Sequence, residues 1–112
     1  MSDCLFCKII SGEIPSSKVY EDDVCLAFND IDPQAPVHFL VIPKTHIGSV
    51  AEVNGGNSAV VAHICEVIAK ITKEKNIESY RVVSNIGEQA GQSVPHLHFH
   101  VLSGRDMTWP PG

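Results

Sequence analysis

The sequence predicts one α+β domain in which an antiparallel sheet carries a single main helix. Three observations support this prediction. Short apolar runs bounded by turn residues occur in both halves of the chain, one long amphipathic segment separates them, and no repeat or low-complexity tract is present. The 112 residues, 44% of them hydrophobic and 19% charged, suit one globular domain over 1–112, with 103–112 as a C-terminal tail. Because the strands precede and follow the helix, we expect them to pair antiparallel.

The expected elements can be placed along the chain in order. Five apolar runs predict strands at 18–21, 24–28, 38–42, 80–84 and 96–102. Helical spacing and cap residues predict a short helix over 4–10, a possible short one over 49–53 and the main helix over 59–75. In the main helix the apolar positions recur every three or four residues, at Val60, Val61, Ile64, Val67, Ile68 and Ile71.

Charge and cysteine content narrow the function classes. The formal net charge of −5 disfavours a nucleic-acid binder, because an acidic surface repels a polyphosphate backbone. We see no signal peptide and no apolar run of membrane-spanning length, so a cytoplasmic protein with reduced thiols is expected. Cys25 and Cys65 are expected in the core, whereas Cys4 and Cys7 form a Cys-x-x-Cys pair that indicates metal or redox chemistry.

The most informative segment alternates histidines with apolar residues, from His96 through His98 and His100 to Leu102. On a strand, the three imidazoles would share one face and stand roughly 6–7 Å apart. Three interpretations are open at this point. The alternation is a chance feature of a half-buried strand, a zinc or copper site, or a catalytic row acting on phosphorus. In the last case a neutral imidazole attacks phosphorus and its neighbour donates a proton or hydrogen bond.

The loop before the histidines favours phosphate chemistry. Gly87 and Gly91 flank this loop, and Gln92 and Ser93 bring an amide and a hydroxyl to the start of the histidine segment. Asn85 adds a further amide at the end of the neighbouring predicted strand. Together with backbone N–H groups, such donors hold phosphate oxygens without a basic protein field. An ordinary glycine turn is the alternative interpretation of this loop.

The histidine segment resembles the signature of the histidine-triad (HIT) family. Further blocks resemble the Hint branch of that family and occur in order along nearly the whole chain, at 14–15, 20–22, 27–28, 30–31, 33–36, 38–44, 91–94 and 109–112. The resemblance implies a HIT-like fold whose sheet extends across a homodimer. It also implies hydrolysis of purine nucleoside phosphoramidates or acyl- and aminoacyl-adenylates to an AMP-like or GMP-like monophosphate, with no metal needed for the chemistry.

The resemblance also implies residue roles. His98 corresponds to the nucleophile that takes the nucleotidyl group, His100 contacts the α-phosphate, and His38 supports the triad by hydrogen bonding. Asp30 corresponds to the ribose-binding acid, and Trp109 lies in a tail that approaches the partner's site. The nucleotide-binding positions carried over are Leu5, Phe6, Ile9, Phe28, Asn29, Asp30, Ile31, Leu40, Asn85, Gln92, Ser93, Val94, His98 and His100. Pro95 and Asp32 depart from the common pattern, which leaves the leaving-group preference open.

A structural zinc site is a further implication of the resemblance. Many bacterial members begin with a similar Cys-x-x-Cys-Lys-Ile block and bind zinc through both cysteines and two histidines. The corresponding residues here are Cys4, Cys7, His46 and His96. Two sulfurs and two nitrogens suit tetrahedral Zn²⁺, and His96 would then brace the catalytic segment. The alternative is that both cysteines are free thiols on the short helix.

Three rival functions remain. The neighbouring branch of the superfamily hydrolyses dinucleoside polyphosphates, but the short chain and the ending at 109–112 favour Hint. A non-catalytic nucleotide-binding regulatory module is the second rival, although His98, His100, Ser93 and Asn85 are all present. A structural zinc module with an incidental pocket is the third.

Overall fold

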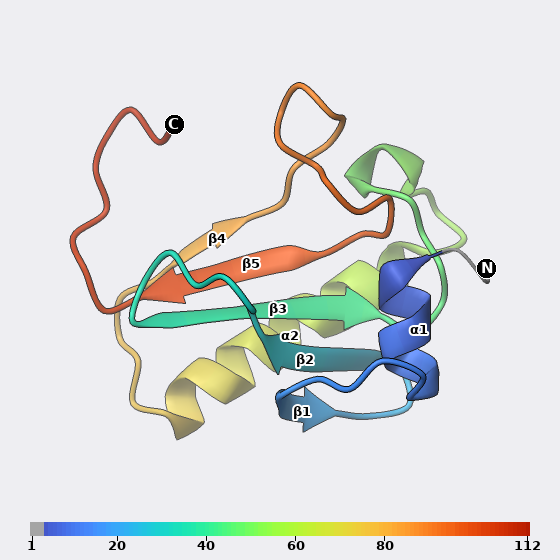
Figure 1. The fold of residues 1–112 in the computed structure, drawn as a ribbon, viewed down its shortest axis with the longest axis horizontal. Coiled ribbons are helices and arrows are strands. Elements are labelled where there is room, and N and C mark those ends of the chain that lie inside the picture. Colours follow the sequence, from blue (N-terminus) through green and yellow to red (C-terminus); the bar gives the residue numbers. More distant parts are fainter. Residues whose placement is uncertain (1–3) are drawn as a thin grey trace.

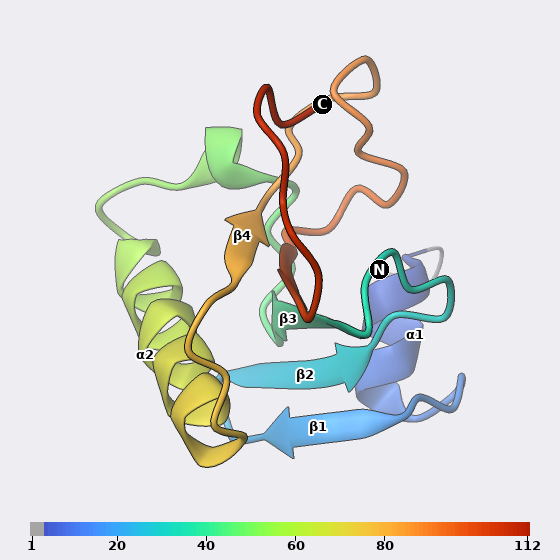
Figure 2. The same ribbon diagram turned by 90° about the vertical axis from the view of Figure 1, so that its left-hand side faces the viewer.

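A central antiparallel sheet carries one helix on each of its faces (Figures 1 and 2). The computed structural model describes residues 4–112, so residues 1–3 of the predicted 1–112 domain lie outside the described residues. The elements are α1 (Leu5–Ser11), β1 (Lys18–Glu21), β2 (Cys25–Asn29), β3 (Val37–Pro43), a 3-10 turn (Val50–Glu52), α2 (Ser58–Glu74), β4 (Arg81–Val83) and β5 (Phe99–Ser103). The strand order is β1-β2-β3-β5-β4, with every neighbouring pair antiparallel. The predicted α+β fold with five strands, one long helix and a short N-terminal helix is therefore confirmed.

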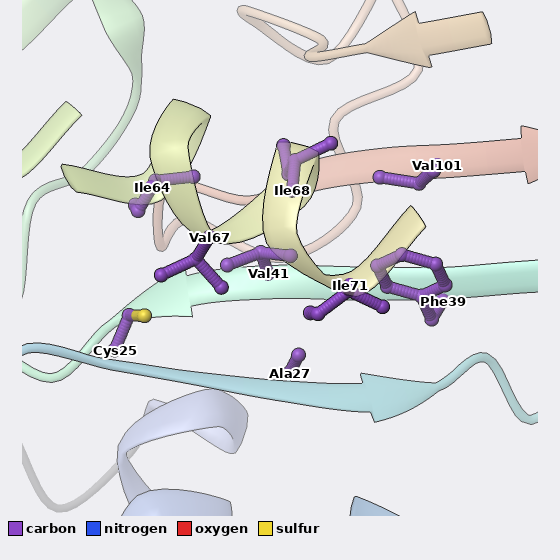
Figure 3. Close-up of a cluster of buried hydrophobic side chains, with 9 residues drawn as sticks. All are labelled: Cys25, Ala27, Phe39, Val41, Ile64, Val67, Ile68, Ile71 and Val101. Carbon is purple, nitrogen blue, oxygen red and sulfur yellow. The ribbon is translucent and has the colours of Figure 1, made fainter. Parts of the chain in front are cut away.

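The main core lies between α2 and the sheet, and Figure 3 shows its side chains. Ile64, Val67, Ile68 and Ile71 recur at helical spacing and are almost fully buried. They pack on residues of β2, β3 and β5, namely Cys25, Ala27, Phe39, Val41 and Val101. Cys25 is in the core as expected, but the prediction for Cys65 is wrong because that residue is exposed. One residue beyond Ile64 on a helix, it turns by about 100° away from the sheet.

A second core lies between α1 and the opposite face of the sheet. In β2 the side chains alternate, so that Ala27 belongs to the α2 core while Leu26 and Phe28 belong to the α1 core. Both faces of this strand are covered, which explains its continuous apolar sequence. α1 contributes Phe6 and Ile9 to this second core, and it ends at Gly12, whose φ of 88° gives the left-handed cap.

The last strand is shorter than predicted. β5 begins at Phe99, three residues after the expected start at His96. In the β3–β5 register Phe99 pairs with Val41, which would place Leu97 opposite Pro43. Proline has no N–H to donate to a ladder, so pairing ends there, and the N–H of Leu97 donates instead to Ile47 O at 2.6 Å.

Among residues 4–112, no helix combines the length and the apolar character needed to cross a membrane.

Candidate functional site

A cavity of about 490 Å³ opens between α1, the end of β2, the middle of β3, and the segment that leads into the start of β5. Its walls are mostly apolar, and two imidazoles border it. Of the predicted nucleotide-binding residues, those that line it are Leu5, Phe6, Ile9, Phe28, Asn29, Asp30, Ile31, Leu40, Ser93, Val94, His98 and His100. Ile31 is 100% exposed, so it forms part of the rim rather than a buried wall. The structure thus gathers residues from five separate parts of the chain around one space.

Sequence reasoning missed one side of the cavity. Ile14, Pro15, Ser16 and Ser17, which connect α1 to β1, also line it. The Oγ of Ser17 accepts a hydrogen bond from Nδ2 of Asn29 at 3.0 Å, which joins this connection to the end of β2. The only local signal was a turn after Gly12, and a turn does not reveal which face of the domain it borders.

Gln92 and Asn85 are not among the cavity-lining residues. The Nε2 of Gln92 donates to Gly48 O at 2.7 Å and to Val94 O at 3.1 Å, while its Oε1 accepts from Gly87 N at 2.9 Å. The amide therefore shapes the loop that carries Ser93. Asn85 packs beside Gly91, where an added Cβ would lie 3.7 Å from its Nδ2.

His98 presents a bare ring nitrogen because of its backbone partner. Its Nδ1 lies 2.7 Å from the carbonyl oxygen of His96, and a carbonyl only accepts, so Nδ1 carries the proton. In the neutral ring, Nε2 consequently carries no proton and presents a lone pair. The residue is 95% buried, and the ring of Phe6 meets the His98 ring edge-on with centroids 5.0 Å apart. An imidazole held in this tautomer presents a fixed lone pair, which suits a nucleophile.

His100 carries its proton on the other ring nitrogen, Nε2, because of its contact with His38. The N–H of Gln34 donates to Nδ1 of His38 at 3.0 Å, so the neutral His38 ring carries its proton on Nε2. That proton is donated to Nδ1 of His100 at 2.9 Å, which leaves the proton of His100 on its own Nε2. Oδ2 of Asp30 lies 3.4 Å from the same His38 Nε2. His38, predicted to support the triad, therefore contacts His100 directly.

Burial keeps His100 neutral. It lowers the pKa of His100 to about 4, and the neighbouring imidazoles of His98 and His38 act in the same direction, against the opposing effect of Asp30. The rings of His98 and His100 have centroids 5.0 Å apart. One side of the cavity thus holds a hydrogen-bond acceptor and a hydrogen-bond donor side by side, an arrangement that suits attack on a phosphorus whose oxygens need a donor.

Cys4, Cys7, His46 and His96 form a cluster with their ligand atoms all within 4.8 Å of one another. Nδ1 of His96 lies 3.3 Å from Sγ of Cys4, 3.6 Å from Sγ of Cys7 and 3.1 Å from Nδ1 of His46. Tetrahedral Zn²⁺ with two sulfur and two nitrogen ligands requires separations of about 3.3–3.8 Å; both sulfur–nitrogen distances lie in this range, and the nitrogen–nitrogen distance is slightly shorter. Nε2 of His96 donates to Pro43 O at 2.9 Å, which leaves Nδ1 free as a ligand. The four residues predicted as ligands therefore fit a zinc ion.

A second group of three potential ligands, Asp22, Cys25 and His63, fits a metal poorly. Asp22 already accepts hydrogen bonds from His63, Tyr20 and the backbone of Val24 and Cys25, at 2.7–2.9 Å. Burial raises the pKa of the Cys25 thiol to about 12, so it stays protonated. This group joins the β1–β2 turn to α2.

Comparisons with known proteins agree with this geometry. Residues 3–109 match a family model described as "Scavenger mRNA decapping enzyme C-term binding". An uncharacterized HIT-like protein of Synechococcus elongatus is 49% identical over 98% of this chain and 97% of its own length. Protein pkiA of Dictyostelium discoideum is 48% identical over 98% of this chain and 90% of its own length.

Solved structures share the fold over nearly the whole chain. A HIT family hydrolase from Legionella pneumophila superposes with a TM-score of 0.95 at 48% identity, covering 98% of this chain and 100% of that one. A histidine triad protein from Clostridium difficile gives a TM-score of 0.92 at 50% identity, covering 96% of each chain.

Proposed function

This chain belongs to the histidine-triad family, and from that membership we propose that it is a nucleotide hydrolase of the Hint type. Its substrates are purine nucleoside phosphoramidates or acyl- and aminoacyl-adenylates, cleaved at the α-phosphate. The observation that carries the proposal is the pair of fixed imidazoles at one cavity, with a bare nitrogen on His98 and a protonated one on His100. The names of solved relatives as HIT family hydrolases support the same reaction class.

The purine binds in the apolar part of the cavity. Phe6, Phe28 and Leu40 offer flat or aliphatic surface to a base, and about 490 Å³ is room for a nucleoside monophosphate. These walls accept adenine or guanine. Asp30 borders the same space, where a carboxylate accepts hydrogen bonds from ribose hydroxyls, and Ser93 supplies a hydroxyl to the phosphate.

The reaction proceeds in two displacements. Nε2 of His98 attacks the α-phosphorus, the phosphorus–nitrogen bond breaks, and the leaving nitrogen takes up a proton from solvent water and departs as an amine. The resulting nucleotidyl-imidazolium keeps its proton on Nδ1. The hydrogen bond that this N–H donates to the carbonyl oxygen of His96 stabilises the new positive charge. Water then attacks phosphorus and loses a proton to the solvent while the phosphorus–imidazole bond breaks, which releases the nucleoside monophosphate and neutral His98. Throughout, the Nε2–H of His100 donates to a non-bridging phosphate oxygen.

We also propose that Cys4, Cys7, His46 and His96 hold a structural zinc ion. The spacing of the four ligand atoms and the bond from His96 to Pro43 support this assignment. The ion supplies a rigid crosslink between α1, the loop after β3 and the histidine segment. Thiolate ligands need a compartment that keeps thiols reduced, which agrees with the expected cytoplasmic location.

A homodimer joined along β4 completes the proposal. β4 is an edge strand of the sheet, and its Val82 is 45% exposed. An edge with an apolar side chain favours pairing with another strand, and a second copy offers the same edge. Light scattering should give the mass of a dimer for the wild type and of a monomer for Val82→Lys; a monomeric wild type would contradict this part of the proposal.

The hydrolytic function is tested with an adenosine phosphoramidate as substrate. We expect turnover by the wild type, a loss of at least about a thousandfold in kcat for His98→Ala, and little change for His63→Gln, a histidine away from the cavity. Mass spectrometry of quenched wild type should find the nucleotidyl adduct on His98. Tight AMP binding without turnover would favour a regulatory module, and preferential cleavage of dinucleoside polyphosphates would favour the neighbouring branch.

A further inference from the structure

The C-terminal tail packs against the loop that joins β2 to β3 and is hydrogen-bonded to it. Gly104, directly after β5, has a φ of 98°, and a Cβ added there would lie 2.9 Å from Cβ of Pro36. Only glycine allows this left-handed turn at such close approach. The tail therefore leaves the sheet beside the start of β3, as Figure 1 shows, and brings Arg105 onto the loop.

Arg105 fixes the backbone of Gln34. Its Nε donates to the carbonyl oxygen of Gln34 at 2.8 Å, while its Nη1 donates to the carbonyl oxygen of Asp106 at 3.1 Å. Two bonds from one planar guanidinium hold the group in a single orientation. The other side of Gln34 points into the site, because its N–H donates to Nδ1 of His38 at 3.0 Å.

The rest of the loop is tied to the same residue. Nε2 of Gln34 donates to Asp32 O at 3.0 Å, and the N–H of Asp32 donates to Oδ1 of Asp30 at 2.8 Å. A continuous set of bonds thus runs from the tail to both Asp30 and His38. These are the two residues whose side chains lie against Nδ1 of His100, at 3.9 Å and 2.9 Å.

We propose that Arg105 is a positioning residue for His100, acting through the backbone of Gln34 and the ring of His38. This inference rests on the proposed function for the role of His100, but its structural part stands separately. Arg105 keeps Gln34 where its N–H meets His38, which holds the His38 proton on Nε2. That proton in turn holds the His100 proton on the nitrogen that meets the phosphate.

Loss of Arg105, where this chain of hydrogen bonds begins, should change the tautomers of His38 and His100. Without Arg105, Gln34 is free to move away from His38, and the Nδ1 of His38 loses its donor. The His38 ring then populates both neutral tautomers, because only the Asp30 carboxylate, 3.4 Å from Nε2, still favours the proton on that nitrogen. When its proton sits on Nδ1, bare Nε2 faces His100, which moves its own proton to Nδ1. The nitrogen that should donate to the phosphate then has no proton.

The test compares four variants of the full-length protein as purified. Arg105→Met removes the donor, Arg105→Lys keeps one cationic donor, and Gly104→Ala displaces the tail by an independent route. Arg81→Met is the matched control, because it also removes an arginine bonded to a backbone carbonyl, that of Thr108 at 3.1 Å, but outside this chain of bonds. Thermal unfolding establishes that each variant is folded.

Two readouts decide the inference. In ligand-free wild type, imidazole ¹⁵N shifts should show the Nε2–H tautomer for both His38 and His100. Arg105→Met and Gly104→Ala should show mixed tautomers, with kcat for the adenosine phosphoramidate about tenfold lower and KM nearly unchanged. Arg105→Lys should recover part of kcat, and Arg81→Met should resemble the wild type in both readouts.

Unchanged tautomers in folded Arg105→Met and Gly104→Ala would overturn the inference, as would an equal effect in Arg81→Met. If the wild type itself does not turn over the substrate, the proposed function fails, yet the ¹⁵N shifts still decide whether Arg105 positions the two histidines.

Discussion

The carbonyl oxygen of His96 accepts the Nδ1 proton of His98 at 2.7 Å, while the ring of His96 lies among the cysteines of the Cys/His cluster. One residue therefore belongs to both the proposed metal site and the orientation of the nucleophile. The ring of Phe6 lies edge-on to both histidines, with centroids 5.9 Å from His96 and 5.0 Å from His98. A change in the Cys/His cluster should for this reason alter the position of the His98 ring.

We expect Cys4→Ser to lose zinc and activity together. A hydroxyl is a far weaker zinc ligand than a thiolate, so the ratio of zinc to protein should fall from about one to near zero. The melting temperature should fall, and kcat should decrease because the His96 carbonyl is no longer held. Elemental analysis measures the metal. Cys65→Ser, at an exposed cysteine on α2, should keep the wild-type ratio; full zinc content in Cys4→Ser would rule out the site.

The cavity walls make a prediction about affinity. Leu5 lines the cavity but is 44% exposed, so Leu5→Glu should leave the fold intact. The variant loses apolar contact with the base and adds negative charge near a phosphate, and Kd for AMP measured by calorimetry should rise about tenfold. Val50→Glu is the matched control, because Val50 is 39% exposed and is not among the lining residues. Equal affinity in both variants would place the base elsewhere.

Local pattern was enough to predict most of the fold. The spacing of Ile64, Val67, Ile68 and Ile71 predicts α2 and its buried face without reference to any other segment. The continuous apolar runs at β2 and β3 predict strands of the sheet that are covered on both faces. The start of β5 was misplaced, since alternation continues through His96 and His98 although Pro43 prevents their pairing with β3.

The site residues also divide into those that the sequence predicts and those that only the folded chain reveals. Residues within the motifs, such as His98 and Asp30, were predicted from sequence by resemblance, and the structure brings them to one cavity. Ser16 and Ser17 were missed because only tertiary folding puts the α1–β1 connection beside β2. Gln92 was expected at the phosphate, but its amide is engaged by the backbone of Gly48 and Val94, a contact that no local pattern encodes.

The pKa of His100 predicts a pH dependence of stability. Burial lowers the pKa from 6.5 to about 4 in the folded chain, so between these values the unfolded chain binds the proton and the folded chain does not. Stability is therefore unaffected by this group above about pH 6.5 and falls as the pH drops from 6.5 towards 4. Relative to His100→Gln, the wild type should lose about 1 kcal/mol more of unfolding free energy per pH unit in this window.

Urea denaturation at pH 7.5, 6.0 and 5.0 measures that difference, and the comparison cancels the other titrating groups shared by both proteins. Parallel curves for the two proteins would mean that His100 titrates near its ordinary pKa, contrary to its buried position.

The final prediction concerns the Asp22 network, which we expect to stabilise the fold without serving catalysis. Burial raises the pKa of Asp22, but the hydrogen bonds from His63, Cys25, Val24 and Tyr20 outweigh it and hold the pKa well below its usual range. Asp22→Asn keeps the oxygen that caps the turn but places an NH₂ group opposite His63. The free energy of unfolding should fall by about 2 kcal/mol, with kcat for the adenosine phosphoramidate unchanged.

The sign of the pH effect separates this carboxylate from His100. A carboxylate whose pKa is lowered by folding stabilises the protein above the unfolded value near 4, and that stabilisation is lost only as the pH falls below it. The gap between wild type and Asp22→Asn should therefore be constant from pH 7 to about 5 and shrink in more acidic solution. Asp23→Asn, at the exposed neighbouring position, should match the wild type throughout. A gap that stays unchanged as the pH falls to about 3 would mean that folding does not lower the pKa of the Asp22 carboxylate.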